Sequence, residues 1–143
     1  MLPFYQYYFG SFANSANDDF KRKWATYAKV KKLPGADNPL TNDPMEATYI
    51  GINMWKQAVE KAKTTDVDRV IEAMAGQSYL APDGFVVQMD EKNHHLRKPL
   101  FVGELRANGH FEVVWSSRVL IKAQPWSPFI PGNRNKRDEP NQR

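Results

Sequence analysis

Hydrolytic and acyl-transfer enzymes need a nucleophile beside a positioned base, and this chain has few residues of either kind. It contains no Cys and three histidines, His94, His95 and His110. Ser116 and Ser117 stand at the end of a predicted strand, without the flanking residues of a known nucleophile motif. His110 follows a predicted turn and is expected to be exposed. We therefore predict no catalytic triad and expect that the chain is not an enzyme.

A metal site is the next possibility, because the run Asp90-Glu91-Lys92-Asn93-His94-His95 contains metal-binding residue types. Adjacent histidines in a strand or loop project in different directions, which makes them a poor pair of ligands. A polar loop whose side chains hydrogen-bond the backbone explains the run more simply. The other carboxylates are scattered and no glycine-rich phosphate loop is present. No metal and no cofactor is predicted.

The aromatic run near the start is the one plausible recognition surface. Tyr5, Tyr7, Tyr8 and Phe9 combine apolar rings with hydroxyl groups, which suits a small polar ligand. The alternative is that these residues belong to the core at alternate positions, and we expect this for at least half of them.

Charge and composition exclude several classes of protein. The net charge is +4, with 41% hydrophobic and 13% aromatic residues, so the chain can bury a core. Positions 127–143 hold four basic and two acidic residues, so they carry +2 and the remainder also carries +2. No basic stripe results, and no nucleic-acid partner is predicted. We expect 1–126 to be folded and 127–143 to be a mobile basic tail.

No apolar run approaches the roughly 20 residues of a membrane span. The first residues lack the basic and apolar regions of a signal peptide, so expression of the chain as given is expected to leave it in the cytoplasm.

Three helices are predicted from apolar spacing. The first follows possible caps at 14–17, carries its apolar stripe on Phe20, Trp24, Tyr27 and Ala28, and ends before 33–35. The second starts at Asp43-Pro44-Met45-Glu46, where Asp43 and Glu46 would form a capping box, and runs to about Lys63. Its expected buried stripe is Met45, Tyr49, Ile52, Trp55 (or Lys56), Val59 and Ala62. The third starts at Asp66 and should bury Val67, Val70, Ile71 and Met74, with Gly76 after its end.

Strands are predicted at both ends of the chain. The aromatic stretch at 4–12 predicts a buried strand that leads into a loop. A turn at 81–84 precedes a strand at 85–89, and strands at 100–106 and 110–115 form a hairpin. Asn108-Gly109 between alternating runs predicts a type I′ turn. The expected fold class is therefore α/β, with about three helices followed by a strand and a β-hairpin.

Several segments together resemble the last third of amide/urea-type solute-binding proteins of ABC importers. They are Asp43-Pro44-Met45-Glu46-Ala47-Thr48-Tyr49, the continuation at 55–62, 65–68, 76–79, 81–84, 90–96 and 103–117. Each segment alone is weakly specific, but their order and spacing match from about Tyr7 to Ser117. The family usually has Gly-Pro-Val where this chain has Gly84-Phe85-Val86, and residues after Pro125 have no counterpart that we can name.

The resemblance implies a partial type I periplasmic-binding-protein fold, in which two α/β lobes close on a ligand and the chain crosses between them. It implies a periplasmic receptor that binds urea, a short amide or a similar small polar solute and works with an ABC transporter permease. The ligand-binding residues that it implies are Tyr7, Tyr8, Phe9, Asp43, Pro44, Met45 and Glu46. For Asp43 and Glu46, capping of the helix is the simpler interpretation.

A second hypothesis stays open beside this one. The chain would be a truncated α/β fragment without ligand binding, and uncovered sheet edges and apolar helix faces would drive formation of a homo-oligomer.

Overall fold

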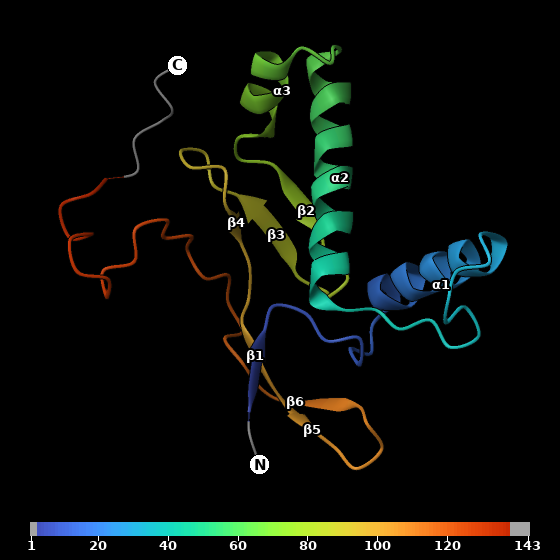
Figure 1. The fold of residues 1–143 in the computed structure, drawn as a ribbon. Coiled ribbons are helices and arrows are strands. Elements are labelled where there is room, and N and C mark those ends of the chain that lie inside the picture. The colour runs from blue at the N-terminus through green and yellow to red at the C-terminus, as the bar shows by residue number, and fades with distance from the viewer. Residues whose placement is uncertain (1–2, 138–143) are drawn as a thin grey trace.

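The computed structural model describes residues 3–137 and contains three helices and six short strands within that range (Figure 1). In chain order they are β1 (Phe4–Gln6), α1 (Ser15–Val30), α2 (Asp43–Ala62), α3 (Val67–Met74), β2 (Ser78–Leu80), β3 (Val86–Met89), β4 (Leu96–Arg97), β5 (Phe101–Leu105) and β6 (Phe111–Ser116). The predicted α/β class is confirmed. The two shortest later strands, β2 and β4, were not predicted, because three and two residues are too few to show a period.

The strands form two antiparallel sheets, ordered β1-β5-β6 and β2-β3-β4. Figure 1 places β1, β5 and β6 at one end of the molecule, and α2, α3 and the other sheet at the opposite end. The chain passes between these two ends after β1 and again through Lys98, Pro99 and Leu100, which connect β4 to β5. This arrangement matches the two-part organisation that the resemblance implied.

Helix α1 begins as the sequence predicts. The side chain of Asn14 accepts a hydrogen bond from the backbone N–H of Asn17 at 2.9 Å, which makes Asn14 the N-cap. Phe20 and Ala28 are buried, as expected, whereas Tyr27 is exposed. The buried side of α1 is therefore narrower than the predicted stripe.

The start of α2 differs from the prediction. Asn42 is the N-cap, since its Oδ1 accepts from the N–H of Met45 at 3.1 Å and its carbonyl accepts from the N–H of Glu46. The predicted capping box between Asp43 and Glu46 is wrong. The side chain of Glu46 is completely buried and does not return to the helix start.

The face of α2 that is buried also differs from the predicted one. Its buried residues are Glu46, Ile50, Met54 and Ala58, at a regular spacing of four. Ile50 and Met54 pack with Ala81, Val87 and Met89 from the loop before β3 and from β3 itself. Ile52 and Trp55, which the sequence placed in the core, are 63% and 48% exposed. The buried row begins with the charged residue Glu46. Apolar spacing alone cannot identify a buried glutamate, so the sequence predicted the wrong face of α2 as buried.

Helix α3 packs against the C-terminal half of α2. Asp66, where the sequence predicted the start of this helix, is its N-cap and accepts through Oδ1 from the Arg69 N–H, and Gly76 follows with a φ of +71°. Ala58, Val70 and Ala73 form a small second core. Val67 was expected to be buried but is exposed.

The β5–β6 hairpin is present, but its turn is not the predicted type I′. Among its residues only Gly109 has a positive φ, of +79°, and Asn108 does not. The Gly109 N–H donates to the Arg106 carbonyl, and the Arg106 N–H donates to the His110 carbonyl, each at 2.9 Å. This is the three-residue loop in which a glycine takes the left-handed position. At 81–84 the predicted turn is confirmed, with the Gly84 N–H donating to the Ala81 carbonyl.

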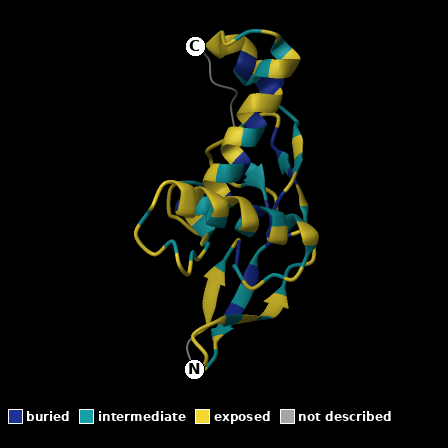
Figure 2. Cartoon of the chain, turned by 90° about the vertical axis from the view of Figure 1, so that its right-hand side faces the viewer, coloured by how far each residue is buried: buried dark blue, intermediate teal, exposed yellow. Residues whose placement is uncertain are grey.

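Within 127–137 the chain forms turns but neither helix nor strand, and 138–143 lie outside the described residues. The mobility of 127–143 stays a prediction. Across residues 3–137, no helix is both long and apolar enough to cross a membrane. Figure 2 shows long stretches of α1 and of the β1-β5-β6 sheet as exposed.

Candidate functional site

A buried ion pair lies where the chain passes between the two sheets. Lys98, in the connection from β4 to β5, places its Nζ 2.5 Å from Oε2 of Glu46 in the first turn of α2. Both side chains are buried. The pair therefore ties the helix of one end of the molecule to the segment that leads into the sheet of the other.

Two further carboxylates surround this ammonium group. Asp83, in the turn before β3, and Asp43, at the start of α2, both interact electrostatically with Lys98. We call these residues, with Tyr7, the Lys98 cluster; it comprises Tyr7, Asp43, Glu46, Asp83 and Lys98. One cation thus faces three carboxyl groups in a largely buried setting.

The burial of these acids changes their protonation. Desolvation raises the pKa of Glu46 from 4.5 to about 7, against the favourable effect of Lys98, and the nearby Asp83 and Asp43 raise it further. Desolvation also raises the pKa of Asp83 and of Asp43, whereas Lys98 and backbone hydrogen bonds lower both. Glu46 is therefore close to its titration midpoint at neutral pH.

The cluster also contains acceptor atoms that the protein does not satisfy. Oε1 of Glu46, Oδ2 of Asp83 and Oδ1 of Asp43 are buried and have no hydrogen-bond partner among the described residues. Unsatisfied buried oxygens are costly, so an acceptor here favours the approach of an N–H or O–H donor.

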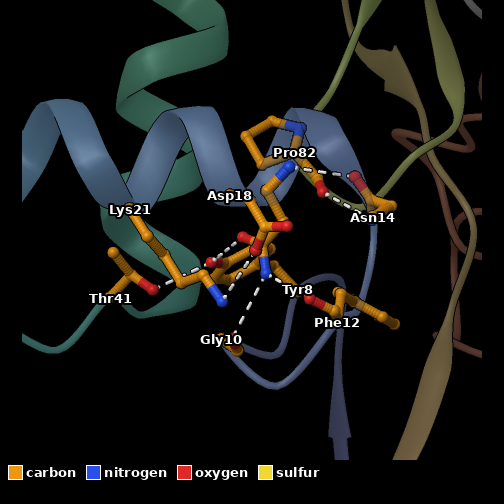
Figure 3. A network of polar contacts seen from close by, with 9 residues as sticks. Tyr8, Gly10, Phe12, Asn14, Asp18, Lys21, Thr41 and Pro82 are labelled. Carbon is orange, nitrogen blue, oxygen red and sulfur yellow. Dashed lines mark hydrogen bonds and ion pairs between the residues drawn. The ribbon is translucent and has the colours of Figure 1, made fainter.

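The two predicted tyrosines take different positions beside the cluster. The ring of Tyr7 lies 5.8 Å from Nζ of Lys98, which is within the range of a cation–π contact, and its side chain is 48% exposed. Tyr8 is fully buried. Its hydroxyl donates to Oδ1 of Asn17 at 2.6 Å and lies 2.8 Å from Oγ1 of Thr41 (Figure 3).

Asn17 completes this second network. Its Nδ2 donates to the carbonyls of Gly10 at 3.2 Å and of Phe12 at 2.7 Å, which folds the segment after β1 onto the start of α1 (Figure 3). The network holds Tyr8, and with it the neighbouring Tyr7, beside α2. Desolvation raises the pKa of Tyr8, so its hydroxyl stays protonated at neutral pH.

Three of the residues that the resemblance implied as ligand contacts, Phe9, Pro44 and Met45, are not members of the Lys98 cluster. The ring of Phe9 packs against Phe12 and Phe111 and fills the space above Gly103, which makes it part of the β1-β5-β6 core. The Pro44 carbonyl accepts from Thr48, and the Met45 N–H donates to Asn42. The N–H groups of Met45 and Glu46 at the helix start are already bonded, to Oδ1 and to the carbonyl of Asn42.

The Asp90–His95 segment is a polar loop, as the simpler interpretation predicted. Oδ1 of Asp90 accepts from the N–H groups of Lys92 and Asn93, and Oδ2 pairs with Arg97 at 2.7 Å. These contacts lower the pKa of Asp90 to about 2. The imidazole of His94 contacts the Ile71 carbonyl at 3.2 Å. Over residues 3–137, no group of three or more His, Cys, Asp or Glu side chains is arranged to hold a metal ion.

Lys98, Asn17 and Thr41 are the important residues that the sequence did not identify. Lys98 offered one signal, since it precedes Pro99 in an otherwise apolar connection between strands. A lysine in such a position needs a buried partner, but the partner is 52 residues away along the chain.

Residues 5–132 match the family described as the periplasmic binding protein domain. The chain belongs to this family. The match covers most of both sheets, all three helices and every residue of the Lys98 cluster.

Solved structures of periplasmic binding proteins share the fold. A solute-binding protein of an ABC transporter from Rhodopseudomonas palustris BisB5, in complex with 3,4-dihydroxybenzoic acid, superimposes with a TM-score of 0.65 at 18% identity, over 84% of this chain and 31% of that one. A counterpart from strain HaA2, in complex with p-hydroxybenzoic acid, gives 0.63 at 19% identity, over 87% and 32%. The chain thus spans about a third of these proteins, and its fold is part of the periplasmic-binding fold.

One curated protein also matches. It is described as a limonene hydroxylase of Geobacillus stearothermophilus and is 31% identical over 96 residues, which are 67% of this chain and 17% of that protein. The chain spans under a fifth of this relative, so the match carries no activity over to it.

Proposed function

We propose that this chain is part of the solute-binding protein of an ABC importer and that the solute is urea, a short amide or a similar small polar molecule. The observation that carries the proposal is the Lys98 cluster, with its unsatisfied carboxylate oxygens beside an exposed tyrosine. It lies at the passage between the two ends of the fold, where relative movement of those ends would alter it.

The chemistry of the cluster suits an amide. An amide or urea presents N–H donors and one carbonyl acceptor in a plane. Carboxylate oxygens accept from N–H groups, and Tyr7 adds both a flat apolar face and a hydroxyl. Tyr7 and Asp43 are the members that are not fully buried, so contact with solute is assigned to them. Glu46, Lys98 and Asp83 are the buried members, and Lys98 contacts the ring of Tyr7.

The relatives suggest a competing class of solute. Two of the solved structures that share the fold contain hydroxylated benzoic acids. Aromatic acids therefore belong in the same binding experiment as amides, and the carboxylates of the cluster predict that an anion will bind there more weakly than a neutral amide.

Calorimetric titration of the purified chain tests the proposal. Urea, acetamide, formamide and p-hydroxybenzoate are titrated into the wild-type chain and into two variants. Tyr7→Ala should reduce the binding heat measured when the amides are titrated in. Tyr27→Ala replaces an exposed tyrosine on α1 and should leave this heat unchanged. No heat with any amide at millimolar concentration, or an equal effect of the two variants, would reject the proposed solute class for this chain.

An importer function implies a permease partner and a location outside the cytoplasm. In the proposed function the chain acts outside the cytoplasm, with a membrane permease that accepts the solute. Binding rather than catalysis is the expected activity, because the Lys98 cluster contains no nucleophile paired with a base.

Self-association is the second candidate, and the unexpected exposure of α2 favours it. Ile52 and Trp55 are apolar, exposed and one turn apart on the helix, and β6 is an edge strand with exposed Val114 and Trp115. Light scattering tests this candidate directly. A concentration-dependent dimer that dissociates in Trp55→Glu would support it, and a monomer at all concentrations would exclude it.

A further inference from the structure

Residues 126–137, which we call the C-terminal segment, fold into consecutive turns to one side of the two sheets (Figure 1). The N–H of Ile130 donates to the carbonyl of Ser127 at 3.2 Å, and the N–H of Asn133 donates to the carbonyl of Ile130 at 3.2 Å. The N–H of Lys136 donates in turn to the carbonyl of Asn133 at 3.0 Å. A backbone hydrogen bond thus recurs every three residues and gives the segment a defined shape without a helix or a strand.

The local sequence explains this shape. Pro131 and Gly132 occupy the central positions of the turn that ends at Asn133, and Gly132 has a φ of +87°, as a type II turn requires. Nζ of Lys136 lies 4.3 Å from the centroid of the Trp126 ring, which is a cation–π contact. The two ends of the segment are therefore in contact, and the residues between them form a closed loop.

This loop presents apolar side chains to solvent. Phe129 is 92% exposed, the highest value of any large hydrophobic residue in the described part of the chain, and its neighbour Ile130 is 55% exposed. Trp126 is also exposed. Single exposed apolar residues are normal on a protein surface, but neighbouring ones indicate an interaction site. Removal of these side chains from water would stabilise a complex with a partner.

Positive charge accompanies the apolar loop. Residues 113–137 contain no acidic side chain and five basic ones, which are Arg118, Lys122, Arg134, Lys136 and Arg137. Asp138 and Glu139 follow in the sequence and reduce the net charge of the region. Arg134 borders one hollow together with Phe129 and Ile130. Within residues 3–137 the guanidinium group of Arg134 has no anionic partner, so it is available to an anion from outside the chain.

Two classes of macromolecule suit exposed rings beside basic residues. Single-stranded nucleic acid stacks its bases on aromatic rings and pairs its phosphates with cations. An anionic membrane surface pairs its phosphates with the same cations, but it takes apolar side chains into its interface. Ile130 favours the membrane, because an aliphatic side chain next to Phe129 offers apolar surface and no flat ring for a base. Trp126, beside Lys136, is typical of residues at a membrane–water interface.

We propose that the C-terminal segment binds the surface of an anionic lipid bilayer. Phe129 and Ile130 enter the boundary between headgroups and acyl chains, and Trp126 lies at the level of the headgroups. Arg134 and Lys136 pair with lipid phosphates. Lys122 and Arg137 border a different hollow, together with Asp90 and Glu91, and are assigned no lipid contact. The segment lies outside the Lys98 cluster, so this inference does not depend on the proposed solute.

Flotation of the purified full chain with lipid vesicles tests the proposal. One set of vesicles consists of phosphatidylcholine alone, and the other also contains phosphatidylglycerol, which is anionic. The chain should float with the anionic vesicles, and added salt should weaken this binding because it screens the attraction between cations and headgroups. No flotation with the anionic vesicles, or equal flotation with both kinds, would overturn the proposal.

Matched variants separate the apolar contribution from the charged one. Phe129→Ala should weaken vesicle binding about tenfold, as loss of a buried phenyl group predicts, whereas Leu40→Ala, at another exposed apolar residue, should not change it. Arg134→Gln should weaken binding about fivefold, and Arg69→Gln on α3 should leave it nearly unchanged. All four side chains are exposed, so the substitutions should leave the fold intact. If Phe129→Ala floats as the wild type does, the loop does not enter the interface and the assignment is wrong.

Competition with a single-stranded oligonucleotide tests the other class of partner. An oligonucleotide that binds the chain and displaces the vesicles would overturn the membrane assignment. The double variant Asp138→Asn/Glu139→Gln removes two negative charges that follow Arg137 and should bind anionic vesicles more tightly. Unchanged or weaker binding by this variant would contradict the electrostatic attraction. Calorimetry with urea and amides reports on the Lys98 cluster, so either proposal can fail without the other.

Discussion

Replacement of Glu46 by Gln tests the electrostatics of the Lys98 cluster, because it removes one ionisable group and keeps its shape. The pKa of Glu46 is raised from 4.5 to about 7 in the folded protein. A folded carboxyl with a raised pKa stabilises the protein fully below pH 4.5, and this contribution is lost as pH rises through about 7. The amide side chain of the Glu46→Gln variant does not titrate, so its contribution stays constant.

The size of the effect follows from the pKa difference. A gap from 4.5 to about 7, at about 1.36 kcal/mol per pH unit, corresponds to about 3 kcal/mol. The free energy of unfolding of the wild type, minus that of Glu46→Gln, should therefore fall by about 3 kcal/mol between pH 4 and pH 8. The other shifted acids are present in both proteins and largely cancel in this difference.

Guanidinium chloride denaturation at a series of pH values measures this difference, and it avoids urea, which is a proposed ligand. Glu60→Gln is the matched control, since Glu60 lies on the same helix and pairs with Lys56 in solvent. Its difference from the wild type should stay flat over the same range. A flat curve for Glu46→Gln, or a difference that grows with pH, would refute the raised pKa and with it the electrostatic account of the cluster.

Five further substitutions test the packing, the hydrogen bonds and the helix cap around the site. Gly103→Ala should destabilise the protein by about 1–3 kcal/mol, because a Cβ there would lie 2.6 Å from the ring of Phe9. Gly51→Ala, in open space on α2, should instead stabilise the protein by up to about 1 kcal/mol. Thermal melts of the two variants compare these effects. Tyr8→Phe should cost about 1–3 kcal/mol in denaturant unfolding, because it leaves the buried amide of Asn17 and the hydroxyl of Thr41 without a shared partner. Asn42→Ala should lower the stability by about 1 kcal/mol and Asp43→Ala by less, because Asn42 is the N-cap of α2. If thermal melts gave the reverse order, Asp43 rather than Asn42 would be the cap.

Local signals in the sequence predicted the helices well. Asn14, within the expected capping segment, caps α1, Asp66 stands at the expected start of α3, and Gly76 takes the left-handed position after α3. These features depend on residues within one turn of each other, so the sequence contains nearly all the information. The hairpin was predicted for the same reason, although its turn type depends on strand twist and register as well as on Asn108 and Gly109.

Features that depend on distant partners were missed or misplaced. Lys98 and Glu46 are 52 residues apart, and although the apolar residues after Lys98 suggest a buried partner, nothing near it in the sequence identifies that partner as Glu46. Tyr8 was predicted as a ligand contact, yet its hydroxyl is committed to Asn17 and Thr41. A hydroxyl in a sequence shows capacity for hydrogen bonding, and only the fold shows whether that capacity is already used.

The misplaced stripe of α2 and the missed ion pair have one cause. Glu46 occupies the first position of the buried row that continues with Ile50, Met54 and Ala58. An isolated glutamate would not be buried there, because the cost of desolvation exceeds what packing returns. Lys98 makes the burial possible, and Lys98 belongs to the connection between the two sheets. The orientation of α2 about its own axis therefore depends on the passage between the two ends of the fold. A solute that altered the Lys98 cluster would act on the helix and on that passage together, which is the coupling that a closing receptor requires.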